Sequence, residues 1–219
     1  RFFISKEDGI VQCTLCPHQC VLKSGQTGIC RVRENRDGEL FSTNYGKVCS
    51  LHLDPIEKKP LFNFFPGSIA YSIGTMGCNF RCKHCQNFDI SQFPRENRGE
   101  VLGEHRTHRQ IVEAAKTAGC RRIAYTYTEP TVFFEFAYDT AILARKEGLK
   151  NLFVSNGYMS ADAAYKISPY LDGINIDIKA FKDEFYKKVC KAHLQPVLDT
   201  CVLARELGIH IELTYLIIP

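Results

Sequence analysis

The chain has 219 residues, of which 45% are hydrophobic and 24% charged, so it can bury a core without disulfide bonds. Its formal net charge of +4 is small and spread along the chain, which argues against a nucleic-acid-binding protein. No apolar run is long enough to span a bilayer, and the first residues lack a signal-peptide pattern. We therefore expect a soluble cytoplasmic protein whose partners are neither nucleic acid nor membrane.

Cysteine is the most informative residue type, because eleven is a high and odd count. Secreted disulfide scaffolds are usually short, loop-rich and even in cysteine number, unlike this chain. Clustered cysteines in a long periodic sequence indicate metal ligands instead. Cys120 and Cys201 lie in helical contexts and are expected to be small core residues. The remaining cysteines include two clusters, which are Cys13, Cys16, Cys20 and Cys30, and then Cys78, Cys82 and Cys85.

The chain divides into an irregular first part and a periodic second part. Residues 1–67 are rich in Gly, Cys and charge, without sustained periodicity. Thr107 and Gln110 form a candidate capping box, and Gly119 and Gly148 are helix stops. Predicted helices run from Thr107 to Gly119, over 132–147, from Ser160 onward, and over 183–189 and 195–207. Predicted strands cover 69–74, 122–126, 151–155, 173–178 and 210–216, the last apolar run continuing to 218.

Alternation of strand and helix at this spacing predicts parallel strands joined by right-handed crossovers, and hence an α/β fold. Five such strands form an open sheet or part of a barrel. In either case ligands bind at the carboxyl ends of the strands. We expect two domains, a Cys-rich metal-binding module over 1–67 and the α/β unit over 68–219.

Directly after the first predicted strand comes a C-x3-C-x2-C loop formed by Cys78, Cys82 and Cys85. Thiolates hold iron–sulfur clusters, and three thiolates on a four-iron cluster leave one iron open to a ligand such as S-adenosylmethionine (SAM). The alternatives are a zinc site with His84, or three unrelated cysteines. Zinc favours paired C-x2-C knuckles, and His84 stands between two cysteines, so the cluster is the preferred interpretation.

This loop and the β/α pattern after it resemble the radical SAM superfamily, and specifically its branch with pyruvate formate-lyase activating enzyme. The resemblance covers 68–219 and implies a partial (β/α)6 TIM-like barrel, a [4Fe-4S] cluster on the three cysteines, and reductive cleavage of SAM. It also implies a one-electron donor of the flavodoxin or ferredoxin type. His84 stands where the superfamily usually has an aromatic residue. The family continues beyond Pro219 into a further strand, so the C-terminal part of the barrel is expected to be missing.

The resemblance also implies SAM-binding residues at the other strand ends. Glu129-Pro130 follows the second strand, where the superfamily has a Gly-Gly-Glu segment that binds the amino group of SAM. Tyr127 and Thr128 replace the glycines, which makes close approach of a ligand harder. A glutamate near a helix start is also favourable through the helix dipole alone. The SAM site implied by the resemblance comprises Thr128, Glu129, Ser155, Asn156, Asp177 and Lys179.

Asp177 and Lys179 have a second interpretation. In the strand over 173–178, alternation places Asn175, Asp177 and Lys179 on one face. Polar groups on an inner face are costly unless they are paired or bind a ligand. A structural Asp177–Lys179 ion pair therefore competes with a ligand-binding role, and the sequence does not choose between them.

The first cysteine cluster has four thiols, enough to close a coordination sphere, so its site is structural or electron-relaying. Zinc and a second iron–sulfur cluster both fit the spacing, and a merely reduced, metal-free set is the remaining alternative. This module and the segment after it resemble the radical SAM member of the AmmeMemoRadiSam system. In that segment Lys58, Lys59 and several phenylalanines dock a partner or, as we favour, cover the barrel mouth.

Three functions follow from these patterns. The first is a radical SAM oxidoreductase that abstracts hydrogen, with a glycine of a partner protein as one candidate target. The second modifies a small molecule or peptide by the same chemistry. The third is a non-catalytic binding module in which both cysteine clusters hold zinc. No side chain is expected to act as a general base or nucleophile.

Overall fold

The computed structural model describes residues 1–217 and shows an α/β fold built on a mixed seven-stranded sheet. The strand order is β12-β11-β10-β9-β7-β6-β8. Ile218 and Pro219 lie outside the described residues, so the end of the predicted last apolar run has no structural counterpart here. Across 1–217, the helices are too short or too polar to cross a bilayer.

Five neighbouring strands of this sheet run parallel, as the sequence predicts. Antiparallel β6 (Lys47–Pro55) and β8 (Glu104–His105) extend the sheet on one side. The carboxyl ends of all five parallel strands therefore share one edge. These strands are β7 (Ile69–Thr75), β9 (Arg122–Tyr125), β10 (Lys150–Ser155), β11 (Gly173–Ile178) and β12 (His210–Tyr215).

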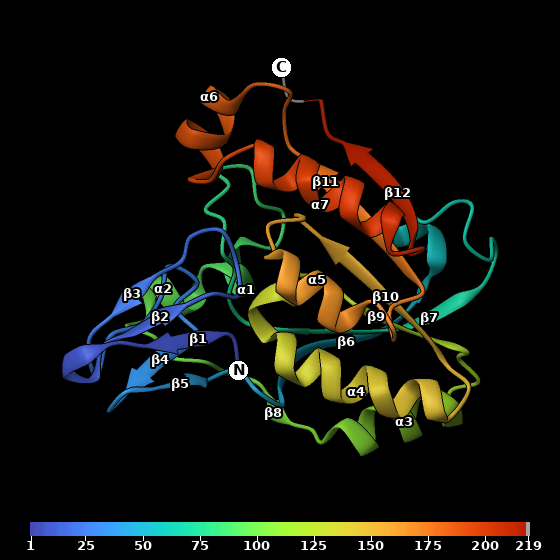
Figure 1. Ribbon diagram of the computed structural model, residues 1–219. Helices are drawn as coiled ribbons and strands as arrows, with labels where there is room; N and C mark the ends of the chain where they lie inside the picture. The colour runs from blue at the N-terminus through green and yellow to red at the C-terminus, as the bar shows by residue number, and fades with distance from the viewer. Residues whose placement is uncertain (218–219) are drawn as a thin grey trace.

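One face of the sheet is covered by helices, as Figure 1 shows. The covering helices are α3 (His108–Thr117), α4 (Phe134–Lys146), α5 (Ala161–Ile167) and α7 (Gln195–Glu206). Shorter helices are α1 (Phe88–Ser91), α2 (Phe93–Glu96) and α6 (Asp183–Phe185), which continues into a π-helical turn over Tyr186–Cys190. One-turn 3-10 helices span Glu7–Gly9, Ile56–Lys58 and Pro130–Phe133.

The opposite face of the sheet is covered by the segment between β6 and β7. Leu61 and Ile56 are fully buried there against the sheet residues Ala70, Ala124 and Leu152. The amide of Asn175 in β11 donates to the carbonyl of Pro60 at 3.0 Å. The segment thus packs on this face of the sheet, with Phe62 and Phe65 exposed, and its expected place over a barrel mouth stays a prediction.

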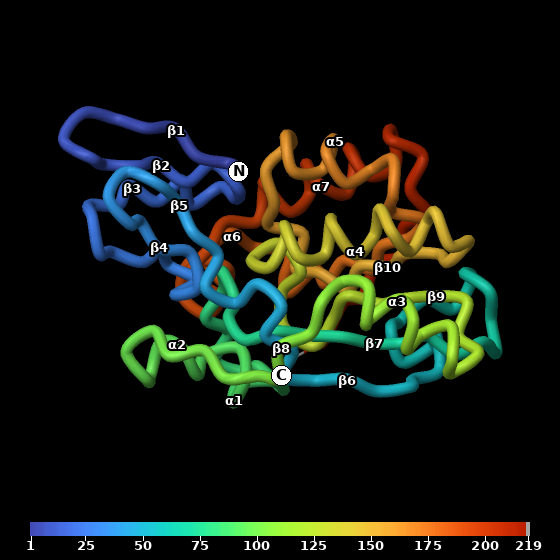
Figure 2. The backbone as a smooth tube through the Cα atoms, turned by 90° about the horizontal axis from the view of Figure 1, so that it is seen from below, coloured from blue at the N-terminus to red at the C-terminus, as the bar shows by residue number. Residues whose placement is uncertain are grey.

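The N-terminal part forms two small sheets rather than an irregular coil. Strands β1 (Phe3–Ser5), β2 (Val11–Cys13) and β3 (Val21–Leu22) pair antiparallel, and β4 (Arg33–Arg36) pairs with β5 (Glu39–Ser42). Strands of two to four residues are too short to show a periodic pattern, which explains why the sequence did not reveal them. Figure 2 shows the two sheets together at one side of the molecule.

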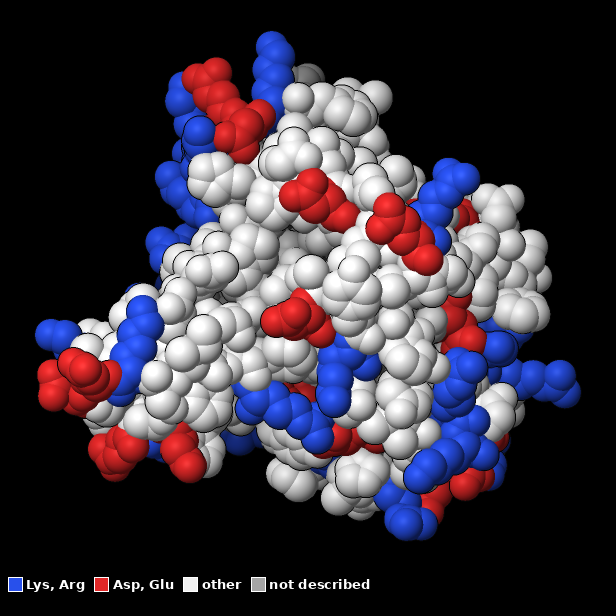
Figure 3. Space-filling view, in the orientation of Figure 1, with Lys and Arg blue, Asp and Glu red and all other residues white. Residues whose placement is uncertain are grey.

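The expected division into a module over 1–67 and an α/β unit over 68–219 stays a prediction. The main sheet itself crosses that position, because β6 pairs with β7 from Val48↔Thr75 to Pro55↔Ile69. On the surface seen in Figure 3, basic and acidic side chains are interspersed, in keeping with the small net charge.

Candidate cofactor-binding site

The loop that carries the second cysteine cluster leaves β7 at the carboxyl edge of the sheet. Gly77 precedes it with φ of +104°, and a Cβ there would lie 2.7 Å from Cγ1 of Val32. Only glycine combines that backbone with so close an approach. The amide of Cys85 then donates to the carbonyl of Cys82 at 3.2 Å, which turns the loop back on itself. The sequence thus folds the three cysteines into one compact loop held against the N-terminal part.

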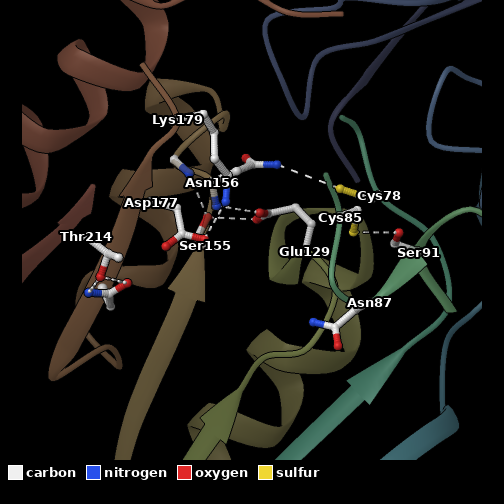
Figure 4. A network of polar contacts seen from close by, with 12 residues as sticks. Cys78, Cys85, Asn87, Ser91, Glu129, Ser155, Asn156, Asp177, Lys179 and Thr214 are labelled. Carbon is white, nitrogen blue, oxygen red and sulfur yellow. Dashed lines mark hydrogen bonds and ion pairs between the residues drawn. The ribbon is translucent and has the colours of Figure 1, made fainter. Parts of the chain in front are cut away.

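Polar groups lie next to the thiols of Cys78 and Cys85 (Figure 4). Sγ of Cys78 accepts the amide of Phe80 at 3.3 Å and lies 3.8 Å from Nδ2 of Asn156. Sγ of Cys85 lies 3.3 Å from Oγ of Ser91. N–H donors of this kind favour the thiolate, the form that binds metal.

The third thiol of the loop, that of Cys82, faces a cysteine distant in sequence. A hydrogen bond with the thiol of Cys190 and burial both raise the pKa of Cys82. The backbone also links the two segments, since the amide of Arg81 donates to the carbonyl of Cys190 at 2.9 Å. Cys190 ends the π-helical turn after α6 and is fully buried. Nothing in its sequence spacing connects it to the cysteine loop.

The donor set of this loop fits a [4Fe-4S] cluster of the radical SAM type. Within residues 1–217, no three His, Cys, Asp or Glu side chains form a ready-made site for a metal ion. The three thiols nevertheless come from one loop, and burial raises the pKa of Cys78, so iron binding must displace its proton. His84, the fourth ligand in the alternative zinc site, has its ring beside that of Phe185, with 6.1 Å between the two centroids. Three thiolates without a fourth protein ligand leave an iron open, as the resemblance requires.

Glu129 connects the ends of two neighbouring strands. Its Oε1 accepts the hydroxyls of Thr131 and Ser155 at 2.6 and 2.8 Å, and its Oε2 accepts the amide of Asn156 at 2.8 Å. Burial raises the pKa of this carboxyl, although the same hydrogen bonds oppose the shift. Asn156 in turn donates to Oδ1 of Asn79 at 2.8 Å. The carboxylate therefore fixes the β9 and β10 loops relative to the residue that follows Cys78.

Thr128 and Tyr127, which stand where the superfamily has two glycines, are each held by a side-chain hydrogen bond. The Thr128 hydroxyl donates to the carbonyl of Thr75 at 2.6 Å. Tyr127 has φ of +69°, and its hydroxyl donates to the buried carboxylate of Asp54. A Cβ on Gly74 would lie 2.7 Å from the carbonyl oxygen of Thr126. The ends of β7 and β9 can therefore approach closely because Gly74 has no side chain.

Asp177 and Lys179 form an ion pair in the structure, with Nζ 2.6 Å from Oδ2. Their side chains are 31% and 19% exposed, so the pair stands at the rim of the site. Burial would lower the pKa of Lys179, but Asp177 outweighs it and the pKa is raised. Asn175, on the same strand, donates to Oγ1 of Thr214 at 2.9 Å instead of joining them. The structural pairing is thus present, and a ligand role remains a proposal.

The site brings together more residues than the sequence indicated. Asn79 directly follows Cys78 and Asn87 lies two residues after Cys85, and their side-chain amides donate to the carbonyls of Tyr158 and Tyr127. Cys190 and the Asp54–Tyr127 contact join the site only through the fold. Position within the cysteine loop was the one signal for the asparagines, whereas the last two had none.

Comparison with known proteins places the chain in a family. Residues 72–219 match the radical SAM superfamily. The chain is 51% identical over 218 residues to the uncharacterized protein MJ0808 of Methanocaldococcus jannaschii, covering all of this chain and 64% of that one. A putative glycyl-radical enzyme activating enzyme of the same organism, MJ1632, is 27% identical over 150 residues, which is 66% of this chain and 54% of that one.

Two solved structures illustrate the fold comparison. SuiB of Streptococcus suis bound to S-adenosylmethionine has a TM-score of 0.47 at 11% identity, covering 65% of this chain and 30% of that one. QueE from Escherichia coli has a TM-score of 0.44 at 10% identity, covering 77% and 93%. From the family match, the chain belongs to the radical SAM superfamily, whose members are enzymes that bind SAM. It spans 64% of the length of MJ0808.

Proposed function

We propose that the chain is the core of a radical SAM oxidoreductase, with residues 68–219 forming a partial (β/α)6 barrel. The observation that carries the proposal is the placement of three thiols on one loop at the carboxyl edge of the sheet, with Sγ of Cys78 lying 3.8 Å from the Asn156 amide. We assign a [4Fe-4S] cluster to Cys78, Cys82 and Cys85. We assign SAM binding to Thr128, Glu129, Ser155, Asn156, Asp177 and Lys179.

Cys78, Cys82 and Cys85 would hold the cluster, which when bound would supply the one-electron reduction that breaks SAM into methionine and a 5′-deoxyadenosyl radical. The protein contributes orientation and exclusion of water. Asn156 directs its amide at Cys78, while Glu129 holds the Asn156 backbone in place. The Asp177–Lys179 pair offers both charges to the zwitterionic methionine or the ribose at the rim. No side chain needs to move a proton.

The proposed reaction is hydrogen abstraction from a glycine of a partner protein. Its support is the likeness to the putative glycyl-radical enzyme activating enzyme MJ1632, in line with the branch suggested by the cysteine loop. The electron comes from a small carrier of the flavodoxin or ferredoxin type.

The test of the cofactor chemistry is anaerobic reconstitution with iron and sulfide, then reduction with dithionite in the presence of SAM. We expect 5′-deoxyadenosine from the wild-type chain and none from Cys82→Ala. Cys201→Ala is the matched control, because that half-buried cysteine lies on α7 outside the loop. A wild-type loop that takes up zinc and no iron would refute the proposal and favour the binding-module interpretation.

The test of the substrate uses a candidate glycyl-radical protein labelled with deuterium at glycine α-carbons. Deuterium in the 5′-deoxyadenosine product, together with an electron paramagnetic resonance signal of the glycyl radical, is the expected result. Cleavage of SAM without transfer of label would exclude that partner as the substrate and leave the cofactor assignment intact.

A further inference from the structure

The first cysteine cluster converges on one cavity although its members are spread over three segments. Cys13 ends β2, Cys16 and Cys20 follow in the loop to β3, and Cys30 precedes β4. All four thiols are free and line a cavity of about 20 Å³ together with His18. The four thiols therefore surround one small cavity, whose size is close to the volume of a single water molecule. Since no three metal-ligating side chains within residues 1–217 form a ready-made site, a bound metal would draw these thiols together.

A backbone N–H group points at one of these sulfurs, because the amide of Ile29 donates to Sγ of Cys20 at 3.4 Å. The same kind of contact is made in the second cysteine cluster, where the amide of Phe80 donates to Sγ of Cys78. Such a donor stabilises the negative charge of a thiolate, which is the form a metal needs. Burial raises the pKa of Cys20, so a metal would have to displace the proton of this thiol.

The cavity lies beside an open groove. The groove, of about 770 Å³, shares His18, Cys20, Gly28 and Ile29 with the lining of the cavity. A metal centre needs an entry path as well as ligands, and the groove brings solvent next to the cavity on the Cys20 side.

Direct contacts connect the cavity to the loop of Cys78, Cys82 and Cys85, here called the catalytic loop. His18, between Cys16 and Cys20, places Nε2 2.8 Å from the carbonyl oxygen of Asn79. Its ring lies 4.9 Å from that of Tyr158, whose own carbonyl accepts the side-chain amide of Asn79 at 2.8 Å. Asn79 directly follows the cluster ligand Cys78, so the loop between Cys16 and Cys20 supports the catalytic loop at its first ligand.

We propose that Cys13, Cys16, Cys20 and Cys30 hold a closed, four-thiolate metal centre, and that this centre supports the catalytic loop through His18. Zn²⁺ and an iron–sulfur cluster share this ligand chemistry, because both bind four thiolates and leave no open position. The metal centre itself does not depend on the proposed radical SAM function, whereas its supporting role rests on that proposed function.

Metal content in a chain without the catalytic ligands tests the centre. In the Cys78→Ala/Cys82→Ala/Cys85→Ala variant we expect mass spectrometry to find one zinc per chain, or iron with inorganic sulfide. Adding Cys20→Ser should abolish this metal, and adding Cys49→Ser, which lies outside the cluster, should retain it. A folded triple variant free of zinc and iron would overturn the proposal.

Thiol protection provides a second measurement if Cys20→Ser fails to fold. Alkylation of the folded triple variant, mapped by peptide mass spectrometry, should spare the four cysteines until a chelator under denaturing conditions removes the metal. Alkylation of all four without any metal release would also overturn the proposal.

The supporting role is tested in the wild-type background with His18→Ala. We expect the reconstituted catalytic cluster to lose iron to a chelator severalfold faster, while the metal of the four-cysteine centre is retained. His193→Ala, which removes an exposed histidine of the π-helical region, is the control. An unchanged rate of iron loss in His18→Ala would refute the support and leave the metal centre standing.

Discussion

The carboxylate of Asp54 is buried and contacts two lysines of very different exposure. Lys59 lies 2.6 Å away with 2% of its side chain exposed, and Lys58 lies 2.9 Å away with 65% exposed. Lys59 also lies over the ring of Tyr127 at 4.4 Å. Removing one partner of a buried pair leaves an uncompensated charge, whereas an exposed pair contributes little.

We therefore predict that Lys59→Met lowers the free energy of unfolding by about 3 kcal/mol, and that Lys58→Met lowers it by less than about 1 kcal/mol. Urea denaturation of the two variants measures the difference. Similar losses would mean that the buried contact to Lys59 has no special weight.

The same carboxylate gives this difference a pH dependence. Burial would raise the pKa of Asp54, but hydrogen bonds from Lys58, Lys59 and Tyr127 outweigh it and lower the pKa well below its ordinary value. A lowered pKa contributes stability that is complete above about pH 4 and is lost as the pH falls further. The gap between wild type and Lys59→Met should therefore narrow below about pH 4, and a constant gap would contradict this account.

At the residue scale the sequence predicted locations better than contacts. Glu129, Ser155 and Asn156 were expected at strand ends, since parallel strands bring their carboxyl ends to one edge, and the structure places them together there. The sequence could not show that Glu129 accepts hydrogen bonds from Ser155 and Asn156, because these bonds depend on side-chain orientation. The pairing of Cys82 with Cys190 depends on how the turn after α6 packs, which no spacing encodes.

At the element scale, prediction succeeded where periodicity was strong. The predicted strands and helices after residue 68 agree with the structure to within about two residues, the usual uncertainty of helix ends. The β4–β5 hairpin was missed although Asp37-Gly38, both at positive φ, is a turn signal. β6 was missed because its pattern is inverted, with Leu51 and Leu53 exposed and Asp54 buried.

The start of α3 offers a test at this scale. The Thr107 hydroxyl accepts the amide of Gln110 at 3.2 Å, and the Gln110 side chain accepts the Thr107 amide at 2.9 Å. Loss of such a cap costs about 1 kcal/mol. We predict that loss for Thr107→Ala in thermal or urea unfolding. Arg109→Ala, an exposed change within the same helix, should leave the stability nearly unchanged, and equal stability of both variants would contradict the capping role.

At the largest scale, the two outer strands of the main sheet within residues 1–217 differ. The β8 edge is short and carries the charged Glu104, which discourages further pairing. The β12 edge is longer, and Leu213 and Tyr215 on it are exposed. An apolar strand edge can pair with another chain.

We predict that Leu213→Lys reduces concentration-dependent self-association of this chain, as measured by light scattering. Val202→Lys is the matched control, because Val202 is similarly exposed but lies on α7. Equal scattering of the wild type and Leu213→Lys would show that the β12 edge does not promote association.

The contact between Cys82 and Cys190 bears on how the protein is assembled. In the cluster-free chain an oxidant such as an organic disulfide would take two electrons from this thiol pair, release two protons and close a bond between the sulfurs. Only Cys78 and Cys85 would then remain as ligands in the loop. We expect no iron to bind until a dithiol reduces the bond between Cys82 and Cys190. Peptide mapping should find this cross-link in air-exposed apoprotein, and Cys190→Ser should accept iron without prior reduction. Assembly of the proposed cluster would thus depend on whether the surroundings keep these two thiols reduced when iron is delivered.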